Sequence, residues 1–153
     1  MAELTLKVGD KAPEFKAKIE TGEEISLSDY QGKKVVLYFY PKDNTPGCTA
    51  QACNLRDNYD TLLKEGYVVL GVSQDTEKKH QNFINKFELP FPLIADTDHV
   101  VHNLYGVWQE KKMYGRTYMG TVRTTFVIDE KGMIEEIISK VKTKEHTEQI
   151  LKN

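Results

Sequence analysis

The sequence predicts an α/β protein in which a central mixed β-sheet is flanked by helices, with a hairpin near the amino terminus. Short apolar runs rich in β-branched residues alternate along the chain with segments whose apolar residues recur at helical spacing. A tight turn joins the last two strand-like runs, which adds an antiparallel pair to the sheet. There is no internal repeat and no linker rich in Pro, Gly or Ser, so we expect residues 1–153 to form a single domain.

The first elements lead to one buried strand. Residues 15–27 alternate loosely around the turn-forming residues 21–24, which predicts a hairpin, and Ser28–Tyr30 suits one helical turn. The run Val35–Tyr40 is continuously apolar or aromatic, as is typical of a strand covered on both faces. This strand delivers the chain directly to Pro41.

Two further strand and helix pairs follow. Apolar residues at helical spacing predict a helix from Pro46 to about Lys64, with Gly66 as its carboxyl-terminal cap. A buried strand is expected at Tyr67–Ser73, a helix at Thr76–Phe87 and a short strand at Leu93–Ala95.

The last part of the chain predicts a hairpin and a closing helix. Asp98 is expected to cap a short helix that runs to Leu104, and residues 107–120 are expected to form a loop. The remaining predicted elements are a strand at Val122–Ile128, a type I turn at Asp129–Gly132, an antiparallel strand at Met133–Ser139 and a helix at Lys144–Leu151.

Composition limits the classes of partner. With 39% apolar and 29% charged residues and a formal net charge of −2, the chain is an ordinary globular sequence, and nucleic acid is not an expected partner. Its longest apolar run, Val35–Tyr40, is too short to cross a bilayer, and Met1–Thr5 lacks a signal-type apolar segment. We therefore expect a cytoplasmic protein without membrane contact. Its two cysteines are then expected to be catalytic or redox-sensing rather than structural.

The candidate functional stretch runs from Pro41 to Cys48, at the carboxyl end of a central strand, where α/β sheets bind ligands. Thr45 suits an N-cap, Pro46 the first helical position, and Gly47 a close approach of the backbone to another group. Cys48 therefore lies in the first helical turn, where free N–H groups and the helix dipole favour a thiolate. The alternative is that Cys48 is a small buried apolar residue after an ordinary turn.

Helix geometry separates the two thiols. At about 100° per residue, Cys48 falls within the apolar arc that contains Ala52 and Leu55, whereas Cys53 lies roughly 140° away on the polar flank. Cα atoms five residues apart on a continuous helix are separated by about 8 to 9 Å, beyond the limit of roughly 7 Å for a disulfide. The two thiols can therefore bond only if the helix unwinds locally. A Cys-x-x-Cys pair does not have this requirement.

The helix dipole alone stabilises a thiolate by about 0.3 to 1 kcal/mol at an exposed site. This is too little to keep Cys48 mostly ionised, so a fixed cation is needed as well. Arg123, a charged residue within an apolar strand, is the candidate cation; the alternative is an arginine on a solvated strand face. Thr45 can cap the helix and also donate its hydroxyl proton to the thiolate or to a peroxide. Pro41 and Pro46 would stiffen the loop, or they are ordinary turn prolines.

These residues resemble the peroxiredoxin family. Pro41-x-x-x-Thr45-x-x-Cys48 matches its active-site signature, and Arg123 within Val122–Asp129 matches its catalytic arginine segment. The spacing to Cys53 and the loop Gly106–Gly115 resemble the bacterioferritin comigratory protein or peroxiredoxin Q group. The resemblance covers nearly the whole chain.

The resemblance implies a thioredoxin-like fold and a thiol peroxidase that needs neither a metal nor an organic cofactor. Cys48 would be oxidised by hydrogen peroxide or an organic hydroperoxide to a sulfenic acid, releasing water or an alcohol. Cys53 would resolve it as an intramolecular disulfide, and thioredoxin or a similar dithiol protein would reduce that disulfide. The expected state is a monomer or weak homodimer.

Two other functions are compatible with the residues alone. One is a general thiol-disulfide oxidoreductase on the same fold, although the spacing of the two cysteines disfavours it. The other is a non-catalytic binding module, such as a holdase, that retains the fold.

Several other residues could in principle take part in binding. His99 and His102 could in principle share a metal, but no further ligand completes such a site. The cluster Lys111, Lys112 and Arg116 is interpreted as a solvated loop rather than a nucleic-acid patch. For Trp108 and Tyr114, the sequence does not decide between the border of the active site and loop packing.

Overall fold

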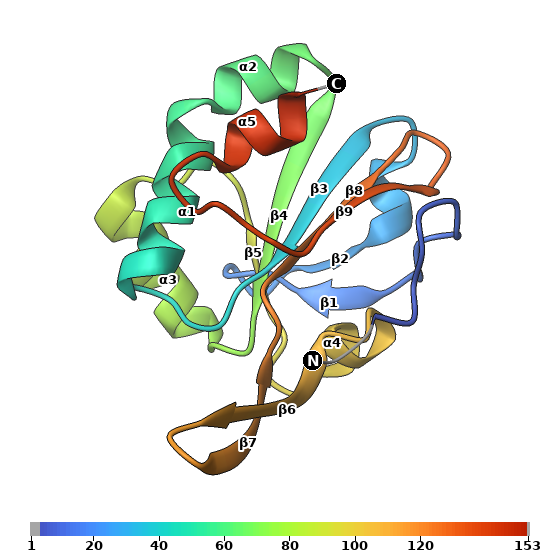
Figure 1. Ribbon diagram of the computed structural model, residues 1–153. Helices are drawn as coiled ribbons and strands as arrows, with labels where there is room; N and C mark the ends of the chain where they lie inside the picture. Colours follow the sequence, from blue (N-terminus) through green and yellow to red (C-terminus); the bar gives the residue numbers. More distant parts are fainter. Residues whose placement is uncertain (1–3, 153) are drawn as a thin grey trace.

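The computed structural model describes residues 4–152. Met1–Glu3, on which the expected absence of a signal segment partly rests, lie outside the described residues. A five-stranded sheet in the order β5-β4-β3-β8-β9 forms the centre of the molecule (Figure 1). Its strands are β3 (Lys34–Phe39), β4 (Tyr67–Ser73), β5 (Leu93–Ala95), β8 (Thr124–Ile128) and β9 (Ile134–Ile138).

The sheet is mixed, as predicted. Strand β3 pairs in parallel with β4, and β4 with β5, whereas β8 lies antiparallel to both β3 and β9. The turn between β8 and β9 is the predicted one, because Gly132 N–H donates to the carbonyl of Asp129 at 3.0 Å. The predicted amino-terminal hairpin is also present, as β1 (Lys16–Lys18) and β2 (Glu24–Ser26), followed by a 3₁₀ turn at Leu27–Tyr30.

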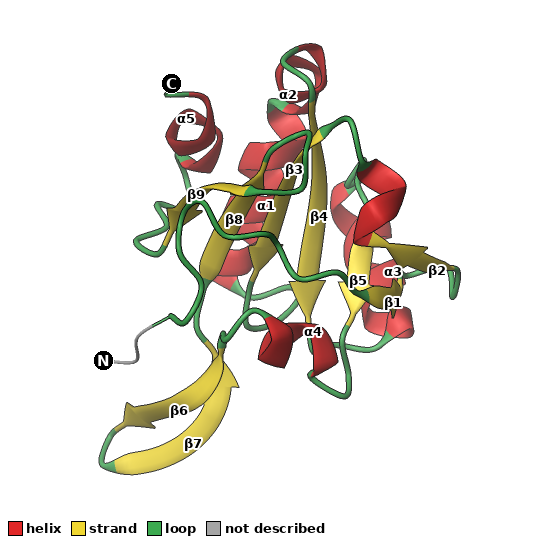
Figure 2. Cartoon of the chain, turned by 90° about the vertical axis from the view of Figure 1, so that its right-hand side faces the viewer, coloured by secondary structure: helices red, strands yellow, loops and turns green. Residues whose placement is uncertain are grey.

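Helices cover both faces of the sheet (Figures 1 and 2). One face carries α1 (Pro46–Asp57), α2 (Tyr59–Lys64), α3 (Glu77–Phe87) and α5 (His146–Leu151); the other carries the β1–β2 hairpin and α4 (Val100–Leu104). Strand β3 contributes alternate side chains to the two cores: Val35, Leu37 and Phe39 pack on the α4 side, and Val36 and Tyr38 on the α1 side. This alternation explains the uninterrupted apolar run in the sequence.

Close packing within the sheet requires glycine at one position. Gly71 of β4 lies beside Tyr38 of β3, and a Cβ at this position would be 2.6 Å from Leu93 and 2.9 Å from the Tyr38 ring. Contacts this short do not occur between real side chains, so the glycine lets the Tyr38 ring lie against the neighbouring strand.

The helix predicted from Pro46 to Lys64 is interrupted, and that prediction is wrong at Asn58. The side chain of Asn58 donates to the carbonyl of Asn54 at 2.8 Å, and its backbone leaves helical geometry at φ −111° and ψ 14°. Asparagine side chains compete with the backbone for such carbonyls, which ends α1 and starts α2 in a new direction.

The expected cap of α4 is also wrong. His99, with φ 62°, occupies the N-cap position in place of Asp98, and the side chain of Asp96 accepts from the N–H groups of Val101 and His102. The predicted cap is correct at Gly66, which has φ 90°. The structure adds a cap at Thr76, whose side chain accepts from Lys79 N–H at 3.2 Å before α3.

Residues 107–120, predicted to form a loop, instead form most of a β-hairpin. Strands β6 (Trp108–Met113) and β7 (Arg116–Thr121) pair antiparallel around Tyr114 and Gly115, whose φ values of 52° and 76° suit a two-residue hairpin turn. The usual Asn-Gly signal is absent because tyrosine occupies the first of these positions. The hairpin projects from the body of the molecule (Figure 2).

Candidate active site

Cys48 and Arg123 meet at one edge of the sheet. Strand β3 leads into the 41–45 loop and then α1, so Cys48 is the third residue of that helix, and its side chain is only 2% exposed. Arg123 lies in the two-residue link between β7 and β8, outside the strand predicted to begin at Val122. Because β8 pairs with β3, this link lies beside the start of α1.

The guanidinium of Arg123 contacts the sulfur directly. Its Nη2 donates to Cys48 Sγ at 3.2 Å, and its Nη1 donates to Gln51 Oε1 at 2.6 Å. A Cβ at Gly47 would lie 3.4 Å from the same Nη2, so the backbone at Gly47 passes close to the guanidinium. The guanidinium therefore places a positive charge directly against a buried sulfur.

Gln51 is a residue of the site that the sequence analysis missed. It is fully buried and fixes one arm of the guanidinium while the other arm contacts Cys48. A signal for it exists in the sequence, because Gln51 follows Cys48 by three residues and thus lies on the same face of the helix.

Thr45 occupies the predicted N-cap position but does not make the predicted side-chain bond. Its backbone is extended, with φ −106° and ψ 155°, and its carbonyl accepts from Thr49 N–H at 2.8 Å. The hydroxyl instead donates to the carbonyl of Lys42 at 2.8 Å, because the tight turn brings that carbonyl within reach. Pro41 is half-buried at the start of this turn.

Cys53 lies on the other flank of α1 and is half-buried, and both cysteines are free thiols in this structure. The segments next to it are tied to other helices: Asn54 Nδ2 donates to the carbonyl of Lys144, and Arg56 Nη1 donates to the carbonyl of Phe87. The predicted contrast between an inward-facing Cys48 and a more accessible Cys53 is therefore confirmed.

Tyr38 lies under the site in the same apolar cluster as Cys48. Burial, together with the negative charges of Asp43 and Cys48, raises the pKa of Tyr38 well above its ordinary value, against a smaller opposing effect of Arg123. Among residues 4–152, its hydroxyl has no hydrogen-bond partner. It therefore remains a neutral phenol within the apolar cluster that contains Cys48.

The histidines that could have shared a metal have other partners. His102 is buried and contacts Asp96 through Nδ1 at 2.6 Å and Thr121 through Nε2 at 2.9 Å. The ring of His99 stacks on Trp108, with ring centroids 3.8 Å apart. Within the described part of the chain, no three His, Cys, Asp or Glu side chains are grouped so that they could hold a metal ion.

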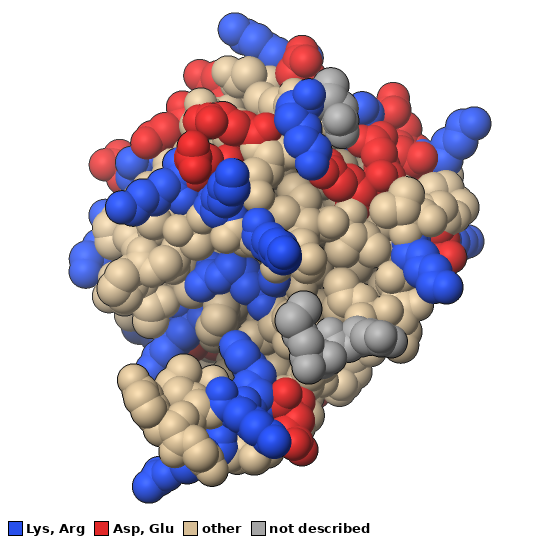
Figure 3. Space-filling model, viewed as in Figure 1, with Lys and Arg blue, Asp and Glu red and all other residues tan. Residues whose placement is uncertain are grey.

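The β6–β7 hairpin carries exposed charge and aromatic surface. Tyr114 at its tip is 97% exposed, and Lys112 and Arg116 face solvent. Figure 3 shows lysine and arginine side chains gathered at this end, and acidic side chains gathered at the end formed by α2 and α5. At the base of the hairpin, the Trp108 ring packs against His99 and His102 at the start of α4. Tyr114, at the tip, lies away from the body of the molecule.

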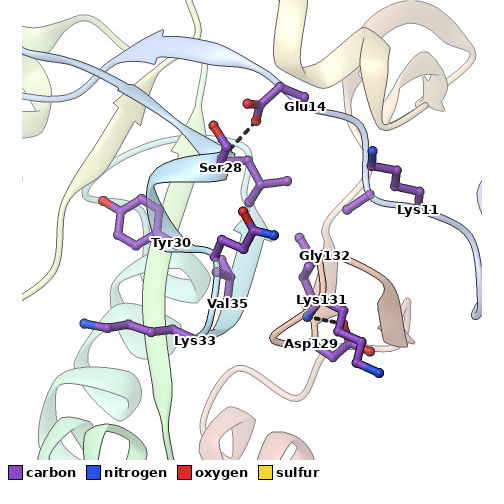
Figure 4. Close-up of a pocket in the computed structure, with 13 residues that line it drawn as sticks. Lys11, Glu14, Ser28, Tyr30, Lys33, Val35, Asp129, Lys131 and Gly132 are labelled. Carbon is purple, nitrogen blue, oxygen red and sulfur yellow. Dashed lines mark hydrogen bonds between the residues drawn. The ribbon is translucent and has the colours of Figure 1, made fainter.

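A cavity of about 300 Å³ lies at the opposite end of β3 from Cys48 (Figure 4). Val35 and Ile128 form part of its apolar wall, and Tyr30 and Lys11 lie at its edge. Its carboxylate Glu14 already accepts from Ser28 N–H at 3.0 Å. Because Val35 lies near the start of β3 and Cys48 follows the end of that strand, this cavity does not open onto the sulfur.

Over residues 4–152, no helix is long and apolar enough to cross a membrane.

Comparison with known proteins identifies the family of the chain. Residues 8–137 match the model of the AhpC/TSA family. The chain is 48% identical over 146 residues to Peroxiredoxin Bcp of Escherichia coli (strain K12), covering 95% of this chain and 94% of that protein. It is 45% identical over 148 residues to Peroxiredoxin Bcp of Bacillus subtilis (strain 168), covering 97% and 94%.

Solved structures show the same architecture. A mutant of Xylella fastidiosa PrxQ superposes with a TM-score of 0.90 at 33% identity, covering 96% of this chain and 94% of that one. Xanthomonas campestris bacterioferritin comigratory protein, studied for its alkyl peroxide reduction activity, gives a TM-score of 0.87 at 32% identity, covering 98% and 96%.

Fold and site together define a thiol peroxidase on a thioredoxin-like fold. The chain belongs to the AhpC/TSA family and is a peroxiredoxin of the Bcp or peroxiredoxin Q group, an enzyme that acts on peroxides.

Proposed function

We propose that this chain reduces hydrogen peroxide and organic hydroperoxides to water and alcohols through Cys48. The observation that carries the proposal is the 3.2 Å contact between Arg123 Nη2 and the buried Cys48 sulfur at the start of α1. The activity described for the Xanthomonas campestris relative supports organic hydroperoxides as substrates.

In the first step the Cys48 thiolate attacks one oxygen of the peroxide. The S–O bond forms as the O–O bond breaks, the sulfur is oxidised to a sulfenic acid, and the departing oxygen takes a proton and leaves as water or alcohol. Arg123 stabilises the thiolate and the charge that develops on the departing oxygen. Gln51 holds the guanidinium in place through its 2.6 Å contact.

Thr45 and Pro41 have supporting roles in this proposal. The Thr45 hydroxyl donates to the Lys42 carbonyl in this structure, and it can turn to donate to the bound peroxide instead. Pro41 restricts the backbone at the start of the loop and limits access of water to the sulfur.

In the second step Cys53 resolves the sulfenic acid. Its thiolate attacks Cys48 Sγ, the S–S bond forms, and the sulfenic oxygen leaves as water. Thioredoxin or a similar dithiol protein then reduces the disulfide by thiol-disulfide exchange. No metal or organic cofactor takes part in either step.

The proposed reaction cycle also bears on the oligomeric state of the protein and on where it acts. Because both thiols belong to one chain, catalysis needs no residue from a second copy, so we propose one domain over residues 1–153 that acts as a monomer or weak homodimer. The reducing cytoplasm supplies the dithiol that recycles it.

The 2% exposure of Cys48 favours peroxide over a protein disulfide as the oxidant. A peroxide is small enough to approach a sulfur in a narrow opening, whereas a disulfide on another protein must reach it through the surrounding side chains.

Stopped-flow oxidation of the reduced protein tests the proposal. Hydrogen peroxide should consume both thiols rapidly in the natural chain, and Cys48→Ser should abolish the fast phase. Cys53→Ser should turn over once and leave a sulfenic acid that dimedone traps. Oxidation of Cys48 no faster than that of a free cysteine would refute the peroxidase proposal.

A further inference from the structure

The loop that presents Cys48 is tied to the rest of the molecule by a buried polar network. Asp43, 8% exposed, places Oδ2 2.6 Å from Nδ1 of His80, which is fully buried on α3. Its Oδ1 accepts from the hydroxyl of Tyr40 at 2.5 Å. The N–H of Asp43 donates to Asp75 Oδ2 at 2.7 Å.

Hydrogen-bond chemistry determines the proton positions in this network. His80 Nε2 lies 2.9 Å from the carbonyl of Ile94, and a carbonyl can only accept, so Nε2 carries a proton. Burial raises the pKa of Tyr40 well above its ordinary value, so its hydroxyl stays protonated and donates to Asp43. The other ring nitrogen, His80 Nδ1, then faces Asp43 Oδ2 across the 2.6 Å contact. The imidazole is a two-ended bridge between the backbone of β5 and the loop.

The loop has few other constraints of comparable strength. Asn44 has φ 59°, a left-handed conformation that asparagine adopts more readily than other residues with a side chain, and its Oδ1 accepts from the exposed Lys86 Nζ at 3.3 Å. The next residue, Thr45, makes its side-chain bond within the loop, to Lys42. The direction in which α1 starts is therefore set largely by Asp43, five residues before Cys48.

We propose that His80 is a positioning residue for peroxide reduction, which acts by holding Asp43 and thereby setting where the Cys48 sulfur stands relative to Arg123. His80 comes from a helix 37 residues further along the chain, and its contacts are to Asp43 and Ile94 rather than to the sulfur. Asp43 also lies before Pro46, outside the segment that must unwind for the disulfide, so it provides a fixed boundary for that motion. The inference rests on the proposed function.

Two substitutions separate positioning from general stability. The amide of His80→Asn occupies nearly the place of Nδ1 and can still donate to Asp43, but it does not reach Ile94. The amide of His80→Gln reaches toward Ile94 like Nε2 and leaves Asp43 without its partner. Each variant removes one arm of a buried bridge, so their melting temperatures should fall by similar amounts.

The readout is the second-order rate constant for oxidation of Cys48 by hydrogen peroxide in the reduced protein, followed by stopped flow. Because a displacement of about 1 Å at a reacting group can cost on the order of 100-fold, we expect His80→Gln to slow this step by at least about tenfold. His80→Asn should remain within about threefold of the natural chain, since the loop stays anchored.

His102→Gln serves as the matched control. His102 is equally buried and pairs with Asp96 at the same 2.6 Å. Its Nε2 contacts Thr121 and its ring lies against Phe39 and Trp108, so these contacts are not to the 41–45 loop. It should lower the melting temperature and leave the rate constant nearly unchanged.

The outcomes separate the two proposals. Equal rate constants in His80→Asn and His80→Gln, or an equal fall in His102→Gln, would overturn the positioning role and leave the peroxidase proposal standing. A natural chain that itself reacts no faster than free cysteine would overturn the proposed function instead.

Discussion

The guanidinium of Arg123 forms two hydrogen bonds, one to the reacting sulfur and one to a side chain that holds the guanidinium in place. Nη2 donates to the sulfur of Cys48, and Nη1 is fixed by the buried amide of Gln51. A lysine would keep the positive charge but present a single ammonium, without the planar fork that reaches both partners at once. Geometry as well as charge therefore distinguishes arginine at this position.

Replacing Arg123 by lysine should slow the oxidation of Cys48 by about 100-fold, the usual cost of removing one well-placed donor at a transition state. Stopped-flow measurement with hydrogen peroxide gives the rate constant. The matched control is Arg116→Lys on the exposed hairpin strand β7, which should react like the natural chain. A rate constant in Arg123→Lys equal to that of the control would mean that charge alone suffices.

His146 connects pH to stability through the contact of α5 with β8. Burial, aided by the positive charge of Arg123, lowers the pKa of His146, against opposing effects of its hydrogen bond to Gln149 and of Glu136. Its Nε2 lies 2.8 Å from the hydroxyl of Thr125, and its Nδ1 lies 2.9 Å from Gln149 Oε1. The folded state therefore holds this ring neutral.

Stability should consequently decrease as the solution is acidified. The unfolded chain protonates His146 near its ordinary pKa of about 6.5, whereas the folded chain resists protonation to lower pH. The contribution is complete above about pH 6.5 and is lost as the pH falls toward the lowered pKa of the folded state. Urea unfolding of the natural chain and of His146→Gln over this range should show a shallower pH dependence in the variant. Parallel curves would contradict the assignment to His146.

At the scale of elements, α1 has a weakly held start and a firmly held second half. Its first turn contains no acidic residue, and Thr45 makes no side-chain cap bond. Asn54, next to Cys53, donates to the carbonyl of Lys144 at 2.9 Å and accepts from the N–H of Thr147 at 2.8 Å. The helix can therefore open from Pro46 without losing its attachment to α5.

Formation of the Cys48–Cys53 disulfide should therefore remove helical protection from residues 46–53 and preserve it from Asn54 onward. The physical reason is the Cα separation of about 8 to 9 Å across five helical residues, which a disulfide does not span. Amide hydrogen exchange of the reduced and the peroxide-oxidised protein measures this directly. Cys53→Ser, treated identically, should keep its protection, and an intact helix carrying the bond would refute the prediction.

At the scale of the whole molecule, stability resides in the two apolar cores on either face of the sheet. The β6–β7 hairpin adds little to them, because among residues 4–152 its strands pair only with each other and its tip is exposed. One contact of its outer part, the donation from Lys111 Nζ to the carbonyl of Thr121 at 2.9 Å, joins it to its own base.

Replacing residues 110–119 by an Asn-Gly turn should leave the body folded. Loss of the Lys111 bond costs about 1 kcal/mol, which corresponds to a fall of about 2 to 4 °C in the melting temperature of a chain of this size. The rate constant for Cys48 oxidation should stay within about twofold, since no donor to the sulfur comes from the hairpin. Calorimetry checks the first expectation and stopped flow the second. Unfolding of the shortened chain would show that the hairpin supports the core.

Much of this fold could be predicted from local patterns. Strand β3, the turn before β9 and the cap at Gly66 each depend on neighbours within a few residues, and all three were predicted. The break at Asn58 and the β6–β7 hairpin were missed. In the first case a side chain replaced a helical bond, and in the second a tyrosine took a conformation usually given to asparagine. In both cases one residue departs from the usual preference of its type or of its neighbours, and a pattern averaged over several residues does not detect this.

The chemistry at the start of α1 could be predicted from local residues: a cysteine follows Thr45, Pro46 and Gly47, and a second thiol lies on another face of the helix. The sequence also indicated Arg123 as the cation. Only the tertiary structure decided what surrounds them, namely Gln51 on the guanidinium and the bridge from His80 to Asp43. Helical phase and capping are local properties of the backbone. Contacts between β5, α3 and the loop arise only when chain segments distant in sequence are packed together, and no local pattern encodes which side chains then meet.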